Sequence, residues 1–135
     1  MRKSKSAYIN YVCPYCWHTL NNCTCDLFPP YHLILIDKNI QEHIRILNEK
    51  GYRTIGCCEG HYKACINTYI AFVKDYFKDS NDTPEGFEYN RKRKMVTYTY
   101  STRLTKENME NIKMEKLKVL LEWCKNLPDL NTEKN

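Results

Sequence analysis

The sequence lacks the features that mark membrane and exported proteins. No run of apolar residues approaches the length of about 20 that crosses a bilayer as a helix. The basic start, residues 1–5, is not followed by the apolar stretch that a signal peptide requires. We therefore expect a cytoplasmic protein without a membrane partner, in a compartment where thiols stay reduced.

Repeats and the signatures of common enzyme classes are also missing. We find no internal repeat, no low-complexity segment, no glycine-rich phosphate loop and no nucleophile–base pair at a diagnostic spacing. These absences argue against a repeat array, and they favour a binding protein over an enzyme.

The chain does have enough apolar surface for a core. Its 135 residues, 42% of them hydrophobic and 13% aromatic, fit one folded domain, so the eight cysteines are not needed as disulfide staples. In a reducing compartment, that many cysteines indicate metal binding or chemistry. The formal net charge of +5 permits an anionic partner without requiring one.

Four cysteines lie close together near the N-terminus in the pattern C-x2-C-x6-C-x-C: Cys13, Cys16, Cys23 and Cys25. A C-x-x-C turn offers two thiolates from one loop, and zinc takes four thiolates in a tetrahedron. We predict one structural Zn²⁺ held by these four side chains. His18 is an alternative fourth ligand, but we expect it on the surface beside the site.

The tetrapeptide Cys13-Pro14-Tyr15-Cys16 also matches the active-site motif of glutaredoxins. In that family the first cysteine opens a helix within a βαβ unit, whereas here no helical periodicity follows and two further cysteines do. We therefore favour the metal site over redox chemistry.

Hydrophobic periodicity predicts an α+β fold. We expect a zinc knuckle with a basic N-terminal arm at 1–30, an α+β domain at 31–128 and a polar tail at 129–135. The domain should hold a small antiparallel or mixed sheet of about four strands, with two helices on one face. The predicted strands, in chain order, cover residues 8–12, 31–36, 52–57, 67–73 and 95–101. The run 31–36 has the composition of a buried strand.

The first predicted helix begins near residue 39 and ends at Gly51. Asp37 or Asn39 should cap it, with Glu42 completing a capping box. Its core face carries apolar residues at helical spacing, namely Ile40, Ile44 and Leu47.

The second predicted helix covers residues 106–127, with Thr105 as its cap. Its apolar stripe consists of Met109, Ile112, Leu117, Leu120, Cys124 and Leu127, flanked by Leu121 and Trp123. We expect the stripe to pack on the sheet, with Cys124 an inert buried thiol. A homo-oligomer formed through the same stripe is left open.

The turn after the third strand is the candidate functional site. It gathers two thiols, a carboxylate and an imidazole, and its candidate ligand-binding residues are Cys58, Glu59, Gly60 and His61. If the protein is an enzyme, Glu59 and His61 are the expected acid and base. Two alternatives remain: the cysteines are small buried residues, or Cys57 or Cys58 holds a second zinc together with His61 and Cys65.

A second candidate ligand surface combines a basic run with a tyrosine row. The basic residues are Arg91, Lys92, Arg93 and Lys94, and the aromatic ones are Tyr98 and Tyr100. The cations can contact phosphates and the rings can stack bases. In the alternative that we favour, the tyrosines belong to the core and the basic run is a solvated hairpin end.

The pattern Leu47-Asn48-x-x-Gly51-Tyr52-x-Thr54-x-x-Cys57-Cys58-x-Gly60-His61, followed by Tyr69-Ile70-x-Phe72, resembles a set of small Firmicute and phage proteins that often carry a cysteine knuckle in front. Over about ten residues the turn is also similar to the Ser-Cys-Ser-Gly-Arg stretch of the wybutosine-synthesis methyltransferases, which act on tRNA; this chain has His61 in place of the arginine. The second resemblance implies a nucleotide-like ligand at the turn.

Taken together, these features predict a small zinc-binding protein that binds a nucleotide or nucleic acid. The resemblance to phage proteins implies action on a host process or defence signal. One alternative is an RNA- or nucleotide-modifying enzyme of the methyltransferase kind. The other is a zinc-stabilised adaptor that binds a host protein.

Overall fold

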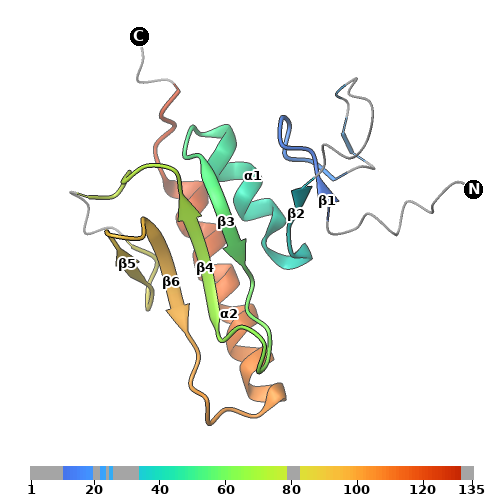
Figure 1. Ribbon diagram of the computed structural model, residues 1–135, viewed down its shortest axis with the longest axis vertical. Coiled ribbons are helices and arrows are strands. Elements are labelled where there is room, and N and C mark those ends of the chain that lie inside the picture. Colours follow the sequence, from blue (N-terminus) through green and yellow to red (C-terminus); the bar gives the residue numbers. More distant parts are fainter. Residues whose placement is uncertain (1–10, 20–21, 24, 26–33, 79–82, 132–135) are drawn as a thin grey trace, which may run out of the picture.

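Figure 1 shows the computed structural model of the protein, which describes residues 11–19, 22, 23, 25, 34–78 and 83–131. The elements, in chain order, are β1 (Tyr11–Val12), β2 (Ile34–Leu35), the 3₁₀ turn η3 (Lys38–Ile40), α1 (Gln41–Glu49), β3 (Thr54–Cys58), β4 (Asn67–Phe72), β5 (Glu88–Asn90), β6 (Met95–Thr99) and α2 (Lys106–Asn126). Four strands form an antiparallel sheet in the order β3–β4–β6–β5, and β1 pairs with β2 in a second, two-stranded sheet. The predicted α+β class is confirmed.

The middle of the larger sheet is formed by β4 and β6, whose alternate residues are apolar or small. Thr68, Ile70 and Phe72 are fully buried along β4, and Val96 of β6 lies opposite Ile70. Successive side chains of a strand point to opposite faces, so one face of these strands builds the core while the other stays partly exposed. The predicted strands at 67–73 and 95–101 are therefore confirmed, apart from their ends.

The long helix α2 lies behind the larger sheet in Figure 1, roughly along its strands, and buries one stripe of its surface. It begins at the predicted cap, where the Thr105 hydroxyl accepts a hydrogen bond from the Asn108 amide at 3.2 Å. Its buried residues are Met109, Lys113, Leu117, Leu120, Trp123 and Cys124. Ile112 was expected in this stripe but is only half-buried, and its neighbour Lys113 is buried in its place. Burial raises the pKa of the Cys124 thiol to about 12, in line with its predicted inertness.

The shorter helix α1 ends as predicted but begins differently. At its end the Tyr52 amide donates to the Leu47 carbonyl and the Gly51 amide to the Asn48 carbonyl. Gly51 has a φ of +98°, so this is a Schellman motif, which favours glycine. The residues of its predicted core face are all buried, namely Ile40, Ile44 and Leu47.

The predicted capping box at the start of α1 is wrong. The turn η3 precedes the helix, and Ile40 occupies the N-cap position without a side-chain hydrogen bond. The polar side chains of Asp37 and Asn39 instead bond to the segment that follows β3. Tertiary contacts have therefore replaced the local caps that the sequence suggests.

The prediction of a buried strand at 31–36 also needs correction. Of residues 34–36, the described part of this predicted strand, only Ile34 and Leu35 are extended; both are exposed and pair with β1, outside the larger sheet. The fourth strand of that sheet is instead β5, which is short and polar and so carries no apolar alternation to reveal it. The predicted strand residues 8–10 and 31–33 lie outside the described residues.

The structure shows contacts across the predicted domain boundaries. Strand β1, from the predicted zinc knuckle, pairs with β2 of the predicted α+β domain. At the other end, Leu130 donates its amide to the Lys50 carbonyl at 2.8 Å, and the Asn131 side chain donates to the Glu49 carbonyl at 2.7 Å. Residues 129–131, assigned to the polar tail, thus lie against the end of α1. Residues 1–10 and 26–30 of the predicted knuckle and arm lie outside the described residues.

Helix α1 packs against α2 and near the start of β3. The more detailed prediction, that both helices lie on one face of the sheet, is not confirmed. Among the described helices, none is both long and apolar enough to span a bilayer.

Candidate functional site

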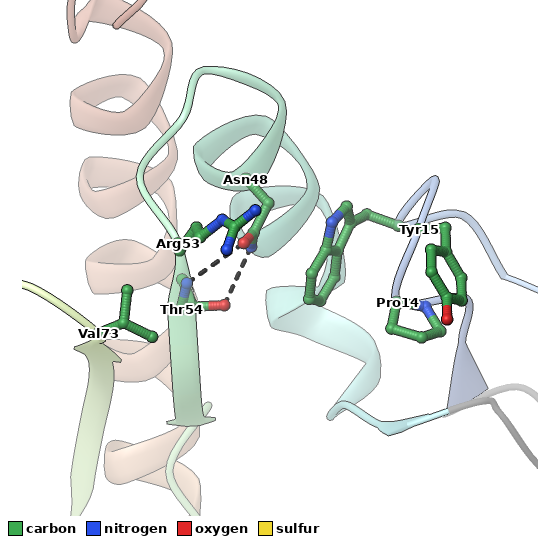
Figure 2. A pocket seen from close by; sticks show the side chains of 7 residues that line it. Pro14, Tyr15, Asn48, Arg53, Thr54 and Val73 are labelled. Atoms are coloured by element: carbon green, nitrogen blue, oxygen red, sulfur yellow. Dashed lines mark hydrogen bonds between the residues drawn. The ribbon is translucent and has the colours of Figure 1, made fainter.

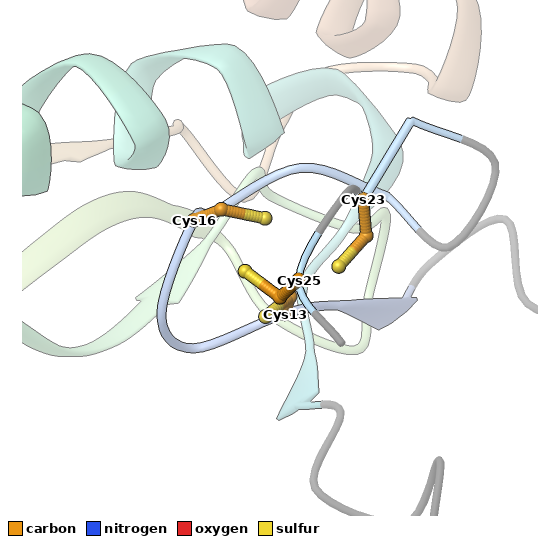
Figure 3. Close-up of side chains that lie close together, drawn as sticks. All are labelled: Cys13, Cys16, Cys23 and Cys25. Carbon is orange, nitrogen blue, oxygen red and sulfur yellow. The ribbon is translucent and has the colours of Figure 1, made fainter. Parts of the chain in front are cut away.

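The predicted zinc ligands are brought together by the fold (Figure 3). One ligand atom from each of Cys13, Cys16, Cys23 and Cys25 lies within 4.8 Å of the others. The cysteine turn (residues 13–19) follows β1 and is closed by two backbone hydrogen bonds, from the Cys13 amide to the His18 carbonyl at 2.9 Å and from the Trp17 amide to the Cys13 carbonyl at 2.8 Å. Four cysteines at this spacing can coordinate a metal ion.

The thiols of this cysteine cluster interact with one another. Hydrogen bonding to Cys16, followed by burial, raises the pKa of the Cys25 thiol to about 12. Burial raises the pKa of the Cys13 thiol, but hydrogen bonds from Cys16 and the nearby backbone outweigh that effect and lower it overall. Because metals bind thiolates, loading of the cluster has to release protons and should weaken as the pH falls.

The turn after β3 forms a second group of ligand-type side chains that includes a residue absent from the sequence prediction. Asp37, Cys58 and His61 place one ligand atom each within 4.8 Å of one another. Nε2 of His61 lies 2.9 Å from Oδ2 of Asp37, and the same oxygen accepts the Glu59 amide at 3.1 Å. No spacing rule connects Asp37 with a residue 24 positions later, so the sequence alone suggested only its role as a helix cap.

Glu59 is occupied in a way that disfavours the predicted acid–base role. Its carboxylate accepts hydrogen bonds from the Asn39 backbone amide, from the Asn39 side chain and from the Lys113 ammonium, at 3.1, 2.9 and 2.9 Å. Burial raises the pKa of this carboxyl, but the bonds from Lys113 and Asn39 outweigh it, so the pKa is lowered overall. A buried carboxylate held ionised by three donors is a structural anchor for the turn.

Thr68 and Tyr100 pack against the same turn at Gly60. Gly60 has a φ of +97°, and a Cβ there would meet the Thr68 hydroxyl and the Tyr100 ring, each at 3.1 Å. The Thr68 hydroxyl bonds both the Glu59 carbonyl and the Tyr100 hydroxyl. Tyr100 is only 1% exposed, so its ring cannot stack on a base. Tyr98, half-buried, packs edge-on against it.

The predicted basic run lies where the favoured alternative put it, at the tip of the hairpin of β5 and β6. All four of its residues are exposed, and Arg91 pairs with Asp75 at 3.1 Å. A backbone bond from the Phe72 amide to the Lys94 carbonyl ties this tip to the end of β4, and one from the Val73 amide to the Arg53 carbonyl ties the end of β4 to the start of β3. One end of the sheet, here called the basic end, therefore gathers exposed cations: Arg53, Lys74, Lys78, Arg91, Lys92, Arg93 and Lys94.

A cleft of about 530 Å³ adjoins the basic end and separates the cysteine turn from the start of β3 (Figure 2). Its lining residues are Pro14, Tyr15, Trp17, Asn48, Arg53, Thr54 and Val73. Tyr15, 66% exposed, and half-buried Trp17 give it an aromatic wall, while Arg53 stands exposed on the β3 side. A second hollow of about 450 Å³ shares Arg53 and extends the cleft toward Lys74 and Tyr76. The sequence did not point to this cleft, because its two walls come from distant segments.

Comparison of the chain with protein-family models, with curated proteins and with solved structures finds no match. The resemblance of residues 47–72 to small Firmicute and phage proteins therefore stays a prediction, as does the resemblance of the turn after β3 to wybutosine-synthesis enzymes.

Proposed function

We propose that the protein binds single-stranded nucleic acid across the basic end of its sheet, with zinc in the cysteine cluster supporting one wall of the binding cleft. The observation that carries this proposal is the juxtaposition of seven exposed cations with a cleft walled by Tyr15 and Trp17. Asp75, partly buried and paired with Arg91, offsets part of that charge.

The chemistry of the two parts favours a single strand over a duplex. Exposed lysines and arginines contact phosphates whatever the base sequence, and this term falls steeply with salt. An exposed tyrosine reaches the face of a base only when the base is unpaired, and such stacking contributes about 1–3 kcal/mol per base. Tyr15 is exposed enough to stack in this way, whereas Tyr100 is not.

The test measures binding of a short, labelled single-stranded RNA or DNA by fluorescence anisotropy, at about 50 and 200 mM salt. We expect affinity to fall with salt, and Arg53→Gln combined with Lys74→Gln to weaken binding and flatten the salt slope. Tyr15→Ala should weaken binding about 5- to 150-fold, as loss of one stacked base would.

The matched control replaces two exposed lysines of α2 that lie away from the cleft, Lys106→Gln with Lys118→Gln. The net charge change equals that of the double variant at Arg53 and Lys74, so a purely non-specific charge effect would weaken both proteins alike. Equal weakening of the two double variants, or no binding at the lower salt, would contradict the proposal.

A protein-binding adaptor is the second candidate, and exposed apolar residues around the open edge of β3 favour it. They are Ile34, Leu35 and Ile55, which line one hollow. Ile55 lies at an irregularity in the pairing of β3 with β4 and is 69% exposed. A partner strand can add to such an edge. A stable complex with a host protein, lost in Ile55→Lys but kept in Arg93→Gln, would favour this function.

A further inference from the structure

The end of β3 away from the basic end brings together three different kinds of metal ligand. Cys58 is the last residue of β3, His61 follows three residues later, and Asp37 arrives from the loop before η3. A thiolate, an imidazole and a carboxylate are the side chains that zinc binds in proteins. Their ligand atoms lie within 4.8 Å of one another, and the carboxylate oxygen and imidazole nitrogen are 2.9 Å apart.

These separations suit a zinc-sized ion. Zinc bonds of about 2.0–2.3 Å in a tetrahedron put neighbouring ligand atoms about 3.3–3.8 Å apart. The Asp37–His61 pair, now 2.9 Å apart, would open slightly to admit the ion. The imidazole can make this movement because its side chain is 45% exposed.

Backbone amides already point at two of the three ligands. The Gly60 amide donates to Sγ of Cys58 at 3.4 Å, and the Glu59 amide donates to Oδ2 of Asp37 at 3.1 Å. Donors of this kind orient a metal ligand. Glu59 itself is fixed by Lys113, so the segment carrying these amides is firmly placed.

We propose that Asp37, Cys58 and His61 form a second metal site for a zinc-like divalent cation, with three protein ligands and a fourth position open to solvent. The imidazole and carboxylate lie at the surface, with side chains 45% and 30% exposed, so this position is accessible. The Cys65 thiol interacts with the Cys58 thiol and donates to the Asn67 carbonyl at 3.5 Å, but it is not among the ligand atoms that all lie within 4.8 Å of one another. Three protein ligands and an open position are typical of zinc that binds an exchangeable ligand, whereas four thiolates are typical of structural zinc.

The test is the number of zinc ions held by the full-length, reduced protein, counted by native mass spectrometry during titration with Zn²⁺. The wild type should take up two, one in the cysteine cluster and one at the proposed site. His61→Gln and Asp37→Asn should each take up one. The affinity of the proposed site for zinc should fall about 100-fold or more in each variant, because loss of a ligand costs more than the 10- to 100-fold loss seen when a residue that hydrogen-bonds to a ligand is replaced. With Co²⁺, these variants should keep the absorption of the cysteine cluster and lose that of the second ion.

Asp75→Asn is the matched control, because it also removes a carboxylate paired with a basic side chain, and it should still bind two ions. Cys65→Ser should bind two ions as well. Loss of the second ion in this variant would mean that Cys65 is the fourth ligand, which would contradict a fourth position open to solvent. Circular dichroism checks that each variant is folded. One zinc in the saturated wild type, or two in both His61→Gln and Asp37→Asn, would overturn the proposal.

Discussion

At the scale of single residues, a buried charge organises the turn after β3. Lys113 and Glu59 are the most buried ion pair among the described residues, with side chains 5% and 7% exposed, and their charged atoms are 2.9 Å apart. Lys113 also donates to the Gly60 carbonyl at 3.1 Å. The pair thus links the middle of α2 to the segment that carries both Cys58 and His61. Such pairs stabilise little when intact, but removing one partner leaves a buried charge.

We therefore expect Glu59→Gln to lower the free energy of unfolding by about 3 kcal/mol, the lower end of the range for a broken buried pair, since Glu110 still contacts Lys113. The matched control is Glu49→Gln, which removes an exposed pair with Arg45 and should cost about 1 kcal/mol or less. Urea unfolding at neutral pH measures both. Equal effects of the two substitutions would show that burial of the Glu59 pair is unimportant.

The same carboxylate predicts a pH dependence. The pKa of Glu59 is lower in the folded protein than its ordinary value, so its contribution to stability is present above about pH 4.5 and is lost as the pH falls through the lower folded value. In the wild type the free energy of unfolding should decrease over this acidic range. Glu59→Gln should lack that part of the decrease, and curves of the same shape for both proteins would contradict the assignment.

At the scale of elements, a single lysine fastens the end of α2 to the end of α1. The ammonium of Lys50 donates to the carbonyls of Cys124, Lys125 and Leu127 at 3.0, 2.6 and 2.7 Å. The last carbonyls of a helix lack partners within the helix, and a cation there also suits the negative end of the helix dipole.

Lys50→Met should therefore lower the free energy of unfolding by about 2 kcal/mol, as expected for hydrogen bonds to a charged group. Lys118→Met, on the exposed side of α2, is the control and should change stability by about 0.5 kcal/mol or less. Thermal unfolding followed by circular dichroism compares them. If Lys50→Met were as stable as the control, this contact would not hold the helices together.

Elements with strong local signals could be predicted from the sequence, and elements fixed by tertiary contacts could not. The Thr105 cap and the Gly51 stop are local, so they were predictable. Asp37 and Asn39 look like caps, yet they bond to the turn after β3, because ordering that turn requires polar partners from elsewhere. Lys113 lies four residues after Met109 and four before Leu117, in the buried stripe of α2. A lysine at such a position was the feature of the sequence that could have indicated a buried ion pair.

At the scale of the whole molecule, the candidate sites depended on which distant segments meet. The cysteine cluster lies within one short segment and was predicted in full. The second ligand group was predicted only in part, because Asp37 joins Cys58 and His61 through the fold. The cleft was not predicted at all, since Tyr15 and Arg53 are on separate segments. Opposite ends of β3 thus carry different candidate sites.

The central claim is that metal in the cysteine cluster positions Tyr15 and Trp17 for binding of a single strand. The most direct measurement compares the affinity of His61→Gln for a labelled single-stranded RNA before and after a chelator removes zinc. This variant lacks one ligand of the proposed second metal site, so the chelator removes metal from the cysteine cluster alone. We predict that the metal-free protein binds at least about 5-fold more weakly, as expected for loss of one stacked base, and that Cys16→Ser behaves likewise. Unchanged affinity in protein shown by mass spectrometry to be free of metal would contradict the account.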